Sequence, residues 1–578
     1  MPGMTRLRWV WLSALIAISA VAAWLWWVKP QKVDMAIYAP ATSLLYLESN
    51  RPLAVVDAIV GTDAWKIVDK ADAVQSRSQP GRWLQSFIGW TGIGPIKSVI
   101  LARAQLAVVV TDLGTADEGE TLKVKPEGAV LIETHTSERR IRAPVEEALG
   151  NLAAITYGNP TSRRITIDGV EFIEWIAPDG SRQIVATIVR SLVIVGNSEQ
   201  VVRNCLAVSL RRSPSLREDP ELGQMRLQLS GDHALTFGYV PAANSARLLA
   251  VGVPLMMSRA PGDSQFQRLI TTNATKVFGS LGWSSHAFRS GIEDRYLISL
   301  QPSIVARLQS NFSRARNGTQ VQRRLPDQFH SVTFYKFEDP AAVWQDLKAA
   351  ASSQMDILSA VFFSSILKSA LVSYGIDEPE RFLAAVKGEL ITFRLDQSGE
   401  RTMIVAGVRD QSALREILIT KLGPTSRSDR LANSEILEDA KGEWAVSLNK
   451  DFVVLGAPTD VRRYSQDAKE NGTMNDQNLG KITFFAPLSS SANIVTYTND
   501  GDRVATFIAS VLAAKGTRVT PGAIETLVTD LPYSATETTL SERGLERVTK
   551  SPLGQFSTLL PLVIPENLSP TKNNTSSR

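Results

Sequence analysis

LVIVGNSEQVVR, from Leu192 to Arg203, reappears 260 residues later as FVVLGAPTDVRR, from Phe452 to Arg463. Each copy has an apolar, β-branched run, then a glycine (Gly196, Gly456), then a run of mixed polarity. That pattern is typical of a strand, a turn and a helix. An internal repeat at a long interval indicates that one folding unit occurs twice in the chain.

Three further matches lie in the same order along the chain. Ser43–Tyr46 with Pro52 matches Ser331–Phe334 with Pro340 at an offset of 288, Thr236-Phe237 matches Thr496-Tyr497 at 260, and Gly291-Ile292-Glu293 matches Gly544-Leu545-Glu546 at 253. In the first of these pairs a strand enters a helix whose first turn carries proline, and Asp339 is placed to cap the second copy. A falling offset predicts duplication followed by deletion. Part of the difference is the polar segment 112–128, which we expect to be a mobile loop without a counterpart.

The repeat predicts an α+β fold with two similar halves, each a mainly antiparallel sheet with helices on one face, because many strand pairs are joined by loops too short for crossovers. We place the first half at 33–300, a polar linker at 301–325, the second half at 326–565 and a disordered tail at 566–578. In the second half we expect strands at 389–395, 402–408, 444–448 and 452–455, the last two as a hairpin, and helices at 411–422 and 459–467.

Residues 9–28, WVWLSALIAISAVAAWLWWV, carry no charge. A helix of that length spans about 30 Å, one bilayer core. Tryptophans stand at both ends, where interfacial indoles are expected, namely Trp9, Trp11, Trp24, Trp26 and Trp27. The segment therefore predicts a transmembrane anchor, with residues 1–8 as a cytoplasmic stub and the C-terminal domain extracytoplasmic, at the inner (cytoplasmic) membrane. A signal peptide cleaved after Ala22 is the alternative, but the apolar run continues to Val28.

The formal net charge of +4 comes from the region of the anchor. Residues 1–32 hold four basic and no acidic residues, which leaves 58 Lys and Arg against 58 Asp and Glu in the remainder. A nucleic-acid partner needs a surplus of cations, so we expect none. The expected partners are the bilayer, through residues 9–28, and an envelope protein or cell-wall component. The oligomeric state stays open.

The sequence predicts no catalytic, cofactor-binding or metal-binding residue. One cysteine, Cys205, excludes an intramolecular disulfide, and the four histidines are widely spaced. The phosphate-binding loop, the zinc-protease motif and the nucleophile-elbow motif are absent. Ser365 and Lys368 have the spacing of a serine–lysine pair without its partner motifs, and 499–502 (NDGD) is interpreted as a turn before a helix rather than a calcium loop. Cys205 is interpreted as a buried thiol in a helix.

The segment 355–374, MDILSAVFFSSILKSALVSY, is apolar but is interrupted by Asp356 and Lys368. We interpret it as a buried or groove-covering helix rather than as a second span.

A leading anchor, the strand signature of Pro40, Ser43 and Tyr46, and a later copy of the strand-helix unit resemble uncharacterised bacterial single-pass envelope proteins with repeated domains of unknown function. In the second copy the proline, Pro326, stands five rather than three residues before the serine. The resemblance implies a location and an architecture but no activity. Two function classes follow: a non-enzymatic binding or scaffolding module of the envelope, or a membrane-tethered hydrolase or transferase with an unrecognised site.

Overall fold

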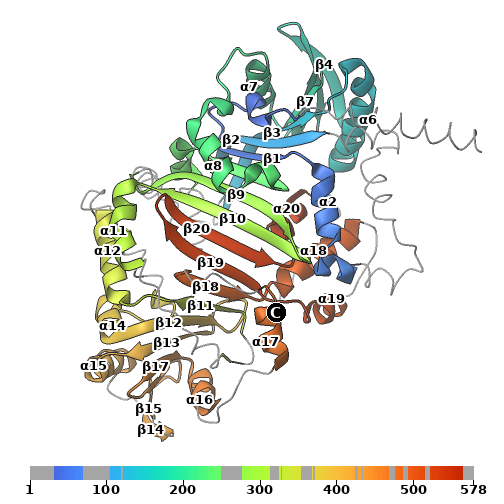
Figure 1. Cartoon of the computed structure of the whole chain (residues 1–578). Coiled ribbons are helices and arrows are strands. Elements are labelled where there is room, and N and C mark those ends of the chain that lie inside the picture. Colours follow the sequence, from blue (N-terminus) through green and yellow to red (C-terminus); the bar gives the residue numbers. More distant parts are fainter. Residues whose placement is uncertain are drawn as a thin grey trace, which may run out of the picture.

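The computed structural model describes residues 32–68, 104–118, 121–248, 276–312, 325–326, 329–352, 368, 371–423, 427–431, 434–467, 476–485, 492–514 and 521–563. These residues form an α+β structure in which one large antiparallel sheet runs through the whole molecule (Figure 1). Residues before 313 occupy the upper part of Figure 1 and most of those after 328 the lower part, with β10 and β20 side by side at the centre.

The sheet is 20-stranded, and all its pairs are antiparallel. From the upper edge to the centre the spatial order is β4 (Thr161–Ile167), β5 (Val170–Ile176), β6 (Gln183–Val189), β7 (Leu192–Gly196), β3 (Thr121–Glu133), β2 (Gln105–Glu118), β1 (Leu45–Ser49), β8 (Thr236–Val240), β9 (Phe278–Phe288) and β10 (Gly291–Leu300). From the centre to the lower edge it continues with β20 (Gly544–Ser551), β19 (Ser534–Ser541), β18 (Ile494–Thr498), β11 (Ser331–Tyr335), β12 (Val386–Arg394), β13 (Thr402–Val408), β17 (Phe452–Gly456), β16 (Ala445–Leu448), β15 (Ser434–Glu438) and β14 (Arg427–Leu431). When both lists are followed outward from the centre, each strand of the lower part carries the number of its counterpart in the upper part plus ten.

The pairing registers give the residue-by-residue correspondence of the two sets of strands. They reproduce the offset of 260 for β7 and β17 and that of 253 for β10 and β20. They also identify the counterpart of Tyr46 in β1. Followed from one paired residue to the next across three strand pairs, the register leads from Gly196 to Tyr46. The same three steps lead from Gly456 to Val332, not to Phe334.

The offset of that strand is therefore 286 rather than 288, and that of β8 is 258 rather than 260, since Tyr46 pairs with Tyr239 and Val332 with Tyr497. The ungapped sequence matches slipped by two residues at both strands. A slip of two keeps every side chain on its face of the sheet, so the apolar pattern alone could not detect it.

The two sets of strands meet in the antiparallel pair β10–β20. Arg295 pairs with Val548, and these two residues are themselves counterparts, since 548 exceeds 295 by 253. The register on either side of them is symmetric, with Ile292 opposite Ser551 and Ile298 opposite Leu545. A local pseudo-twofold axis therefore passes between Arg295 and Val548.

The close packing of the two strands at this joint explains why glycine occurs at both matched positions, Gly291 and Gly544. A Cβ on Gly291 would lie 2.5 Å from the carbonyl oxygen of Ser551, and one on Gly544 would overlap the carbonyl oxygen of Ile298. Ser551 and Ile298 are counterparts at the same offset of 253. Glycine is required at both positions because the end of the partner strand passes directly over it.

Helices cover both faces of the sheet, which corrects the expectation of helices on one face. Leu131 of β3 packs in the core that contains α7 (Glu199–Ser209), whereas its neighbour Ile132 packs beneath α6 (Glu138–Tyr157). Likewise Val405 of β13 lies in the core with α16 (Pro458–Asp467), and Ile404 in the core with α15 (Gln411–Leu422). Adjacent strand residues point to opposite faces, so strands that are apolar at every position require cover on both.

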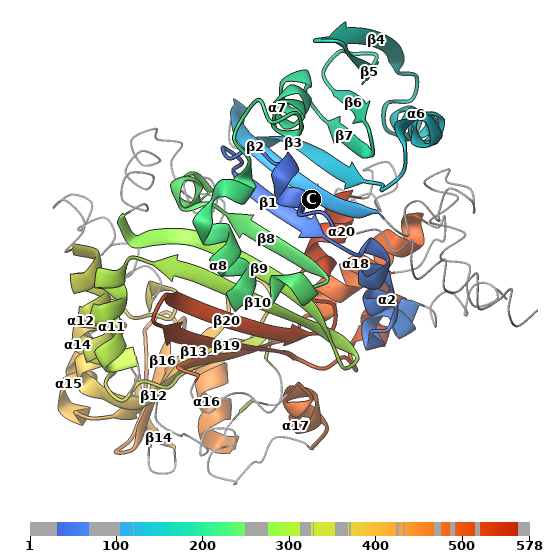
Figure 2. The ribbon, with the colours of Figure 1, turned by 45° about the horizontal axis from the view of Figure 1, so that its top comes forward.

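Several short helices accompany these four. With α7 lie η1 (Met35–Tyr38), η2 (Leu216–Glu218), α8 (Pro220–Gln228) and η3 (Gly231–His233), and Figure 2 shows α8 over β8 and β9. Near α16 lies α17 (Asp476–Thr483), and next to α15 lies α14 (Pro379–Ala385).

Two helix groups join the two parts of the chain. In one group α11 (Pro302–Phe312) packs against α12 (Pro340–Ser352), through Leu308 and Val343. In the other group α2 (Pro52–Val60) contributes Ile59 to a core shared with α18 (Gly501–Ala514), α19 (Pro521–Val528) and α20 (Phe556–Val563). The two groups lie at opposite ends of the central strands (Figure 1), where Ile292 and Ile298 of β10 point into the second and the first group respectively.

Two expectations for irregular segments were wrong. Residues 112–118 and 121–128, expected as a mobile loop, continue β2 and β3 as a paired hairpin with a register shift between Val110 and Asp112. These residues extend past the neighbouring strands, since the pairing of β1 with β2 ends at Val110 and that of β7 with β3 begins at Ala129. In the expected linker, residues 302–312 form α11, whose Ile304, Val305, Leu308 and Phe312 are buried at the i, i+1, i+4 and i+8 spacing of a helix face.

Most local predictions in the second half were confirmed. The strand at 402–408 and the helix at 411–422 have the predicted bounds, the hairpin is β16–β17, and the helix after Gly456 begins at Pro458. The expected strand at 389–395 begins three residues earlier, at Val386.

The anchor segment 9–28, the tail 566–578 and most of 355–374, Ser365 included, lie outside the described residues. In the part of the chain that the structure describes, no helix has both the length and the apolarity needed to cross a bilayer.

Candidate functional site: the N-terminal clamp

The first described residues are held to the sheet by side chains. Gln105, the first residue of β2, is 2% exposed and binds both backbone groups of Val33: its Oε1 accepts from the Val33 nitrogen at 2.8 Å, and its Nε2 donates to the Val33 oxygen at 2.8 Å. The same Nε2 donates to Asn50 Oδ1 at 2.6 Å. The chain is thus fixed one residue after the described part begins, at the ends of β1 and β2.

The one-turn helix η1 follows directly. Asp34 caps it by accepting from the Ala36 nitrogen at 3.1 Å, and Met35 and Ala36 are completely buried. Asp34 Oδ1 also accepts from Arg226 Nη2 of α8 at 2.9 Å. This guanidinium therefore ties the start of the domain to a helix that lies 192 residues further along the chain.

Arg226 also neutralises a buried carboxylate of the central core. Its Nη2 donates to Glu48 Oε2 at 3.0 Å, and the Tyr46 hydroxyl donates to the same oxygen at 2.7 Å. Burial raises the pKa of Glu48, which is 5% exposed, although Arg226 and Tyr46 oppose the shift. Burial alone would lower the pKa of Arg226, but Glu48 and Asp34 raise it above its usual range, so the guanidinium stays charged.

A second buried carboxylate holds the other end of η1. The Tyr38 hydroxyl donates to Glu133 Oε2 at 2.9 Å, and the His135 nitrogen donates to Glu133 Oε1 at 2.9 Å. Burial first, and then Glu133, raise the pKa of the Tyr38 hydroxyl. His135 has a φ of 53°, and its Nε2 lies 3.2 Å from Gln105 Oε1. The left-handed backbone is compensated by the Glu133 hydrogen bond to its own nitrogen.

We call this set the N-terminal clamp; it consists of Val33, Asp34, Tyr38, Glu48, Gln105, Glu133 and Arg226. By strand register, Val332, Phe334 and Gly407 occupy the positions of Tyr46, Glu48 and Glu133 in the second half. These three positions of the second half therefore carry neither the carboxylates nor the hydroxyl of the first half, and this part of the network is not repeated there. Its chemistry is that of a satisfied structural network, because each carboxylate is paired with a donor.

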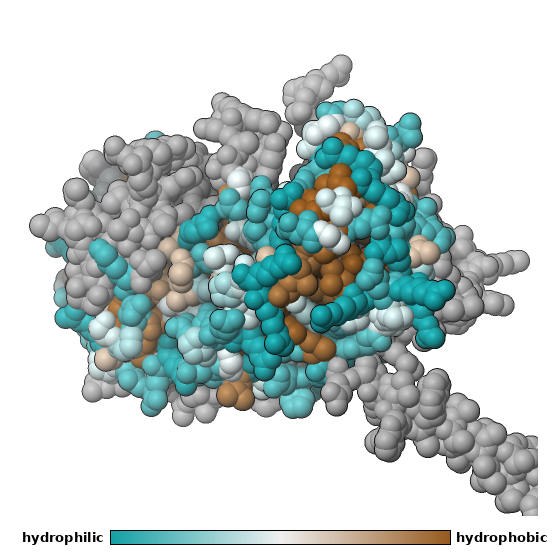
Figure 3. Space-filling model, turned by 90° about the horizontal axis from the view of Figure 1, so that it is seen from above, coloured by the Kyte–Doolittle hydropathy of each residue, from teal (hydrophilic) through white to brown (hydrophobic). Residues whose placement is uncertain are grey.

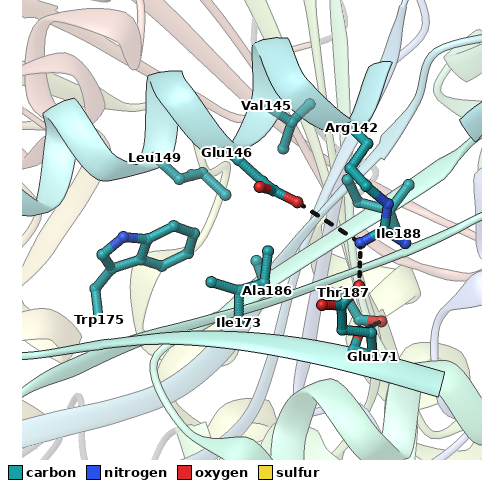
Figure 4. A pocket seen from close by; sticks show the side chains of 10 residues that line it. All are labelled: Arg142, Val145, Glu146, Leu149, Glu171, Ile173, Trp175, Ala186, Thr187 and Ile188. Carbon is teal, nitrogen blue, oxygen red and sulfur yellow. Dashed lines mark hydrogen bonds and ion pairs between the residues drawn. The ribbon is translucent and has the colours of Figure 1, made fainter. Parts of the chain in front are cut away.

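The second candidate is a small cavity between α6 and the strands β5 and β6 (Figure 4). Its volume of about 10 Å³ is room for about one water molecule. At its rim Arg142 Nη1 donates to Glu171 Oε2 at 2.7 Å and lies 3.6 Å from Glu146 Oε1, while Arg164 bridges the same two glutamates. Opposite these charges lie the apolar side chains of Leu149, Ile173, Trp175 and Ala186 (Figure 4). The carboxylates are ion-paired, and no nucleophile with a base lines this cavity.

A second cavity, of about 90 Å³, lies between the start of α14 and α15. Its floor is apolar, with Phe382 and Leu418, and at its mouth Lys421 Nζ donates to Asp377 Oδ2 at 2.8 Å. This volume is well below the roughly 300–1,000 Å³ of ordinary small-molecule sites.

The arrangement closest to a nucleophile and its base lies on β9. Ser284 Oγ is 3.0 Å from His286 Nε2, and Glu293 is the cross-strand partner of His286. However, Ser284 is completely buried and donates to the carbonyl oxygen of Leu229 at 2.8 Å. Burial lowers the pKa of His286, so the imidazole is mainly neutral at pH 7. A substrate carbonyl has no access to this serine in the described structure.

Metal and thiol chemistry find no support among the described residues. No group of three His, Cys, Asp or Glu side chains there is placed to hold a metal ion. Cys205 is completely buried in α7, which confirms the interpretation of a buried thiol in a helix, and burial raises its thiol pKa to about 12. The turn at 499–502 precedes α18 as expected: Asn499 Oδ1 accepts from the Gly501 nitrogen, and Asp500 accepts from Ser534.

The five anchor tryptophans lie outside the described residues. The clamp residues were missed by the sequence analysis. One signal was present: Glu48 interrupts the apolar strand Leu45–Ser49 and faces the same side as Tyr46, which is unusual for a charge without a partner. The partner, Arg226, lies 178 residues away and has no local pattern.

Comparison of the chain with protein-family models, with curated proteins and with solved structures found no match in any of the three.

Proposed function

We propose that the chain is a membrane-anchored, extracytoplasmic protein of the cell envelope that acts as a non-enzymatic binding or scaffolding module. In this proposal residues 9–28 cross the inner membrane once, and two copies of one duplicated unit form the domain outside. The observation that carries it is the N-terminal clamp, because the hydrogen bonds of Gln105 fix Val33, five residues after Val28, and the ion pair with Arg226 fixes Asp34 directly after it. A domain held so close to its anchor has no free linker and keeps one orientation.

The repeated pairing order supports the duplication. Ten strands in each part follow the same spatial order, and counterparts meet at a local pseudo-twofold axis. Unrelated units of strand and helix would not share an order of ten strands. The two parts also share two helical cores, so they form one scaffold rather than two separate binding domains.

The surface supports a binding role. Seen from the end that the first half forms, hydrophobic residues gather in a patch ringed by hydrophilic ones (Figure 3). Apolar side chains also remain exposed on α6, with Leu152 at 37% and Ile155 at 40%. Apolar surface with a polar rim is typical of a protein-binding surface.

Cell fractionation and protease treatment of spheroplasts test the anchoring. We expect the full chain in the inner-membrane fraction, with a C-terminal tag that external protease removes, and a variant lacking residues 9–28 to leave the membrane. A tag that stays protected in intact spheroplasts would contradict the orientation, and a full chain in the soluble fraction would contradict the anchor.

In-cell photo-crosslinking tests the binding role. A photoreactive amino acid at Leu152 should give a defined crosslinked species whose identity recurs between preparations. The matched control places the same group at Asp168, an exposed turn residue of the same half, where no such species is expected. Equal yields at the two positions would contradict a binding surface on α6.

The alternative is a tethered hydrolase, for which the Ser284–His286 contact is the specific observation. A fluorophosphonate probe reacts with activated serines. We expect the full chain to remain unlabelled, because Ser284 is buried. Labelling that disappears in Ser284→Ala would establish the hydrolase instead.

A further inference from the structure

Helix α2 begins beside the point where the chain leaves the predicted anchor. Val33 and Asn50 are both bound by the Nε2 of Gln105, at 2.8 and 2.6 Å. Asn50 precedes by two residues Pro52, the first residue of α2. The start of α2 is therefore tied, through one side chain, to the second described residue.

The length of chain up to the predicted anchor limits how far this point can lie from the membrane. Val33 is the fifth residue after Val28. A fully extended chain covers at most roughly 3.3–3.6 Å per residue, so Val33 lies within roughly 18 Å of the hydrocarbon edge. The headgroup region occupies about 5–8 Å of that distance.

The first turn of α2 has the composition of an interfacial contact. Val55, Ala58 and Ile59 face the core that α2 shares with α18 and α20. On the outside Leu53 is 42% exposed, Arg51 is exposed two residues before it, and Lys32, the residue before the tied Val33, is exposed too. Asp57, also exposed, lies one turn further along the helix, about 6 Å from Leu53 along its axis. An apolar side chain flanked by cations, with the acidic residue set back, suits a surface of anionic lipid.

We propose that the first turn of α2 rests on the lipid surface of the membrane that anchors the chain. Leu53 enters the boundary between headgroups and acyl chains, Arg51 and Lys32 lie among the phosphates, and Asp57 stays in the aqueous headgroup layer. The contact makes the end of the central strands that carries α2, α18 and α20 the membrane side, and α11 and α12 lie at the other end of these strands (Figure 1). This inference rests on the proposed anchor.

Depth measurements on the full chain in vesicles of phosphatidylethanolamine and phosphatidylglycerol test the contact. Spin labels are attached to Leu53→Cys, Asp57→Cys and Val372→Cys in turn; the native Cys205 is completely buried and stays unlabelled. Val372 is the matched control, an apolar side chain that is 46% exposed next to the core of α14 and α15. Flotation of the same samples reports whether the chain is membrane-bound.

We expect the label at position 53 to collide more with oxygen and less with a water-soluble nickel chelate than the label at 372. The label at 57 should fall between them, shallower by about one helical turn. If the chain floats with the vesicles but position 53 is as accessible to the chelate as position 372, the lipid contact is wrong and the anchor stands. If the chain does not float, the proposed anchor fails and the contact with it.

Discussion

Asp294 shows how one buried side chain links distant parts of the chain. It is 1% exposed on β10, accepts from Trp283 Nε1 and from Ser285, and accepts from the Gln555 nitrogen at 2.9 Å, 261 residues away. Burial raises its pKa in spite of these donors. A carboxylate that must lose its hydration here is stabilised only by keeping all three hydrogen bonds.

The raised pKa predicts a pH dependence of stability. The folded state keeps the Asp294 proton at pH values where the unfolded chain, with a pKa of about 3.9, has lost it. This contribution to the free energy of unfolding is therefore full below that value and is lost as the pH rises through the folded pKa. Burial raises the pKa of Glu48 and Asp500 too, with the same sign.

Asp294→Asn isolates this contribution. The amide of the variant cannot accept hydrogen bonds through both of its terminal atoms, so we expect the free energy of unfolding to fall by about 1–3 kcal/mol at neutral pH. Because the amide does not titrate, the free energy of unfolding should also decline less steeply above about pH 4 than in the parent. Urea unfolding at several pH values measures both. Asp168→Asn, on an exposed turn, should change neither quantity, and a parallel decline in parent and Asp294→Asn would contradict the assignment.

The two glycines of the central joint make a second prediction at this scale. Gly291→Ala and Gly544→Ala should each lower the free energy of unfolding by about 1–3 kcal/mol, because a methyl group meets the carbonyl of the opposite strand. Gly223→Ala is the control: it lies inside α8 with nothing near its Cβ position, and should be neutral or stabilising by about 0.5–1 kcal/mol. Similar losses at all three positions in urea unfolding would refute the close approach at the joint.

Among the elements, α11 carries the correction with the largest consequence. The polar residues around it in the sequence suggested a linker. Its apolar face nevertheless packs on α12, a helix of the second half. Leu308 is 3% exposed in that core.

Leu308→Ala should therefore cost about 2–5 kcal/mol, the range for a buried leucine. Leu227→Ala, on the 78% exposed position of α8, should stay within about 0.5 kcal/mol of the parent. Chemical denaturation of both variants measures the difference. A harmless Leu308→Ala would mean that α11 is the flexible connection suggested by its sequence.

Strands were easier to predict than the segments between them. Strands β13, β16 and β17 are buried on both faces, so their sequences are almost continuously apolar. Such a run is recognisable within a few residues. The long hairpin of β2 and β3 was missed because its polar residues do not alternate with apolar ones, and this alternation is the sequence signal of a strand. Register at β1 and β8 was missed because it depends on partner strands, not on the strand itself.

At the scale of the whole molecule, the continuous sheet predicts cooperative unfolding. The pair β10–β20 and the two shared helical cores connect the two sets of strands, so neither half has a core of its own at the joint. We expect one transition in urea, with hydrogen exchange in β3 and in β13 losing protection at the same denaturant concentration. Two separated midpoints, one for each half, would contradict this coupling.

The N-terminal clamp belongs to this scale as well. Its members come from residues 33–48, 105, 133 and 226, and the pairs Asp34–Arg226 and Tyr38–Glu133 form only when β1, β2, β3 and α8 are assembled. No spacing in the chain links them, so none was expected.

The amino-acid sequence by itself determined the repeat, the alternation of strands and helices, the hydrocarbon-length segment before residue 29 and the neutral charge of the remainder, because each of these is a local or additive property. The tertiary structure decided the rest: which strands pair and in what register, that helices cover both faces, that the halves share their cores, and which charges are buried together. Those properties depend on contacts between residues that lie tens to hundreds of positions apart in the chain. The free energy of such contacts leaves no trace in the local pattern of apolar residues.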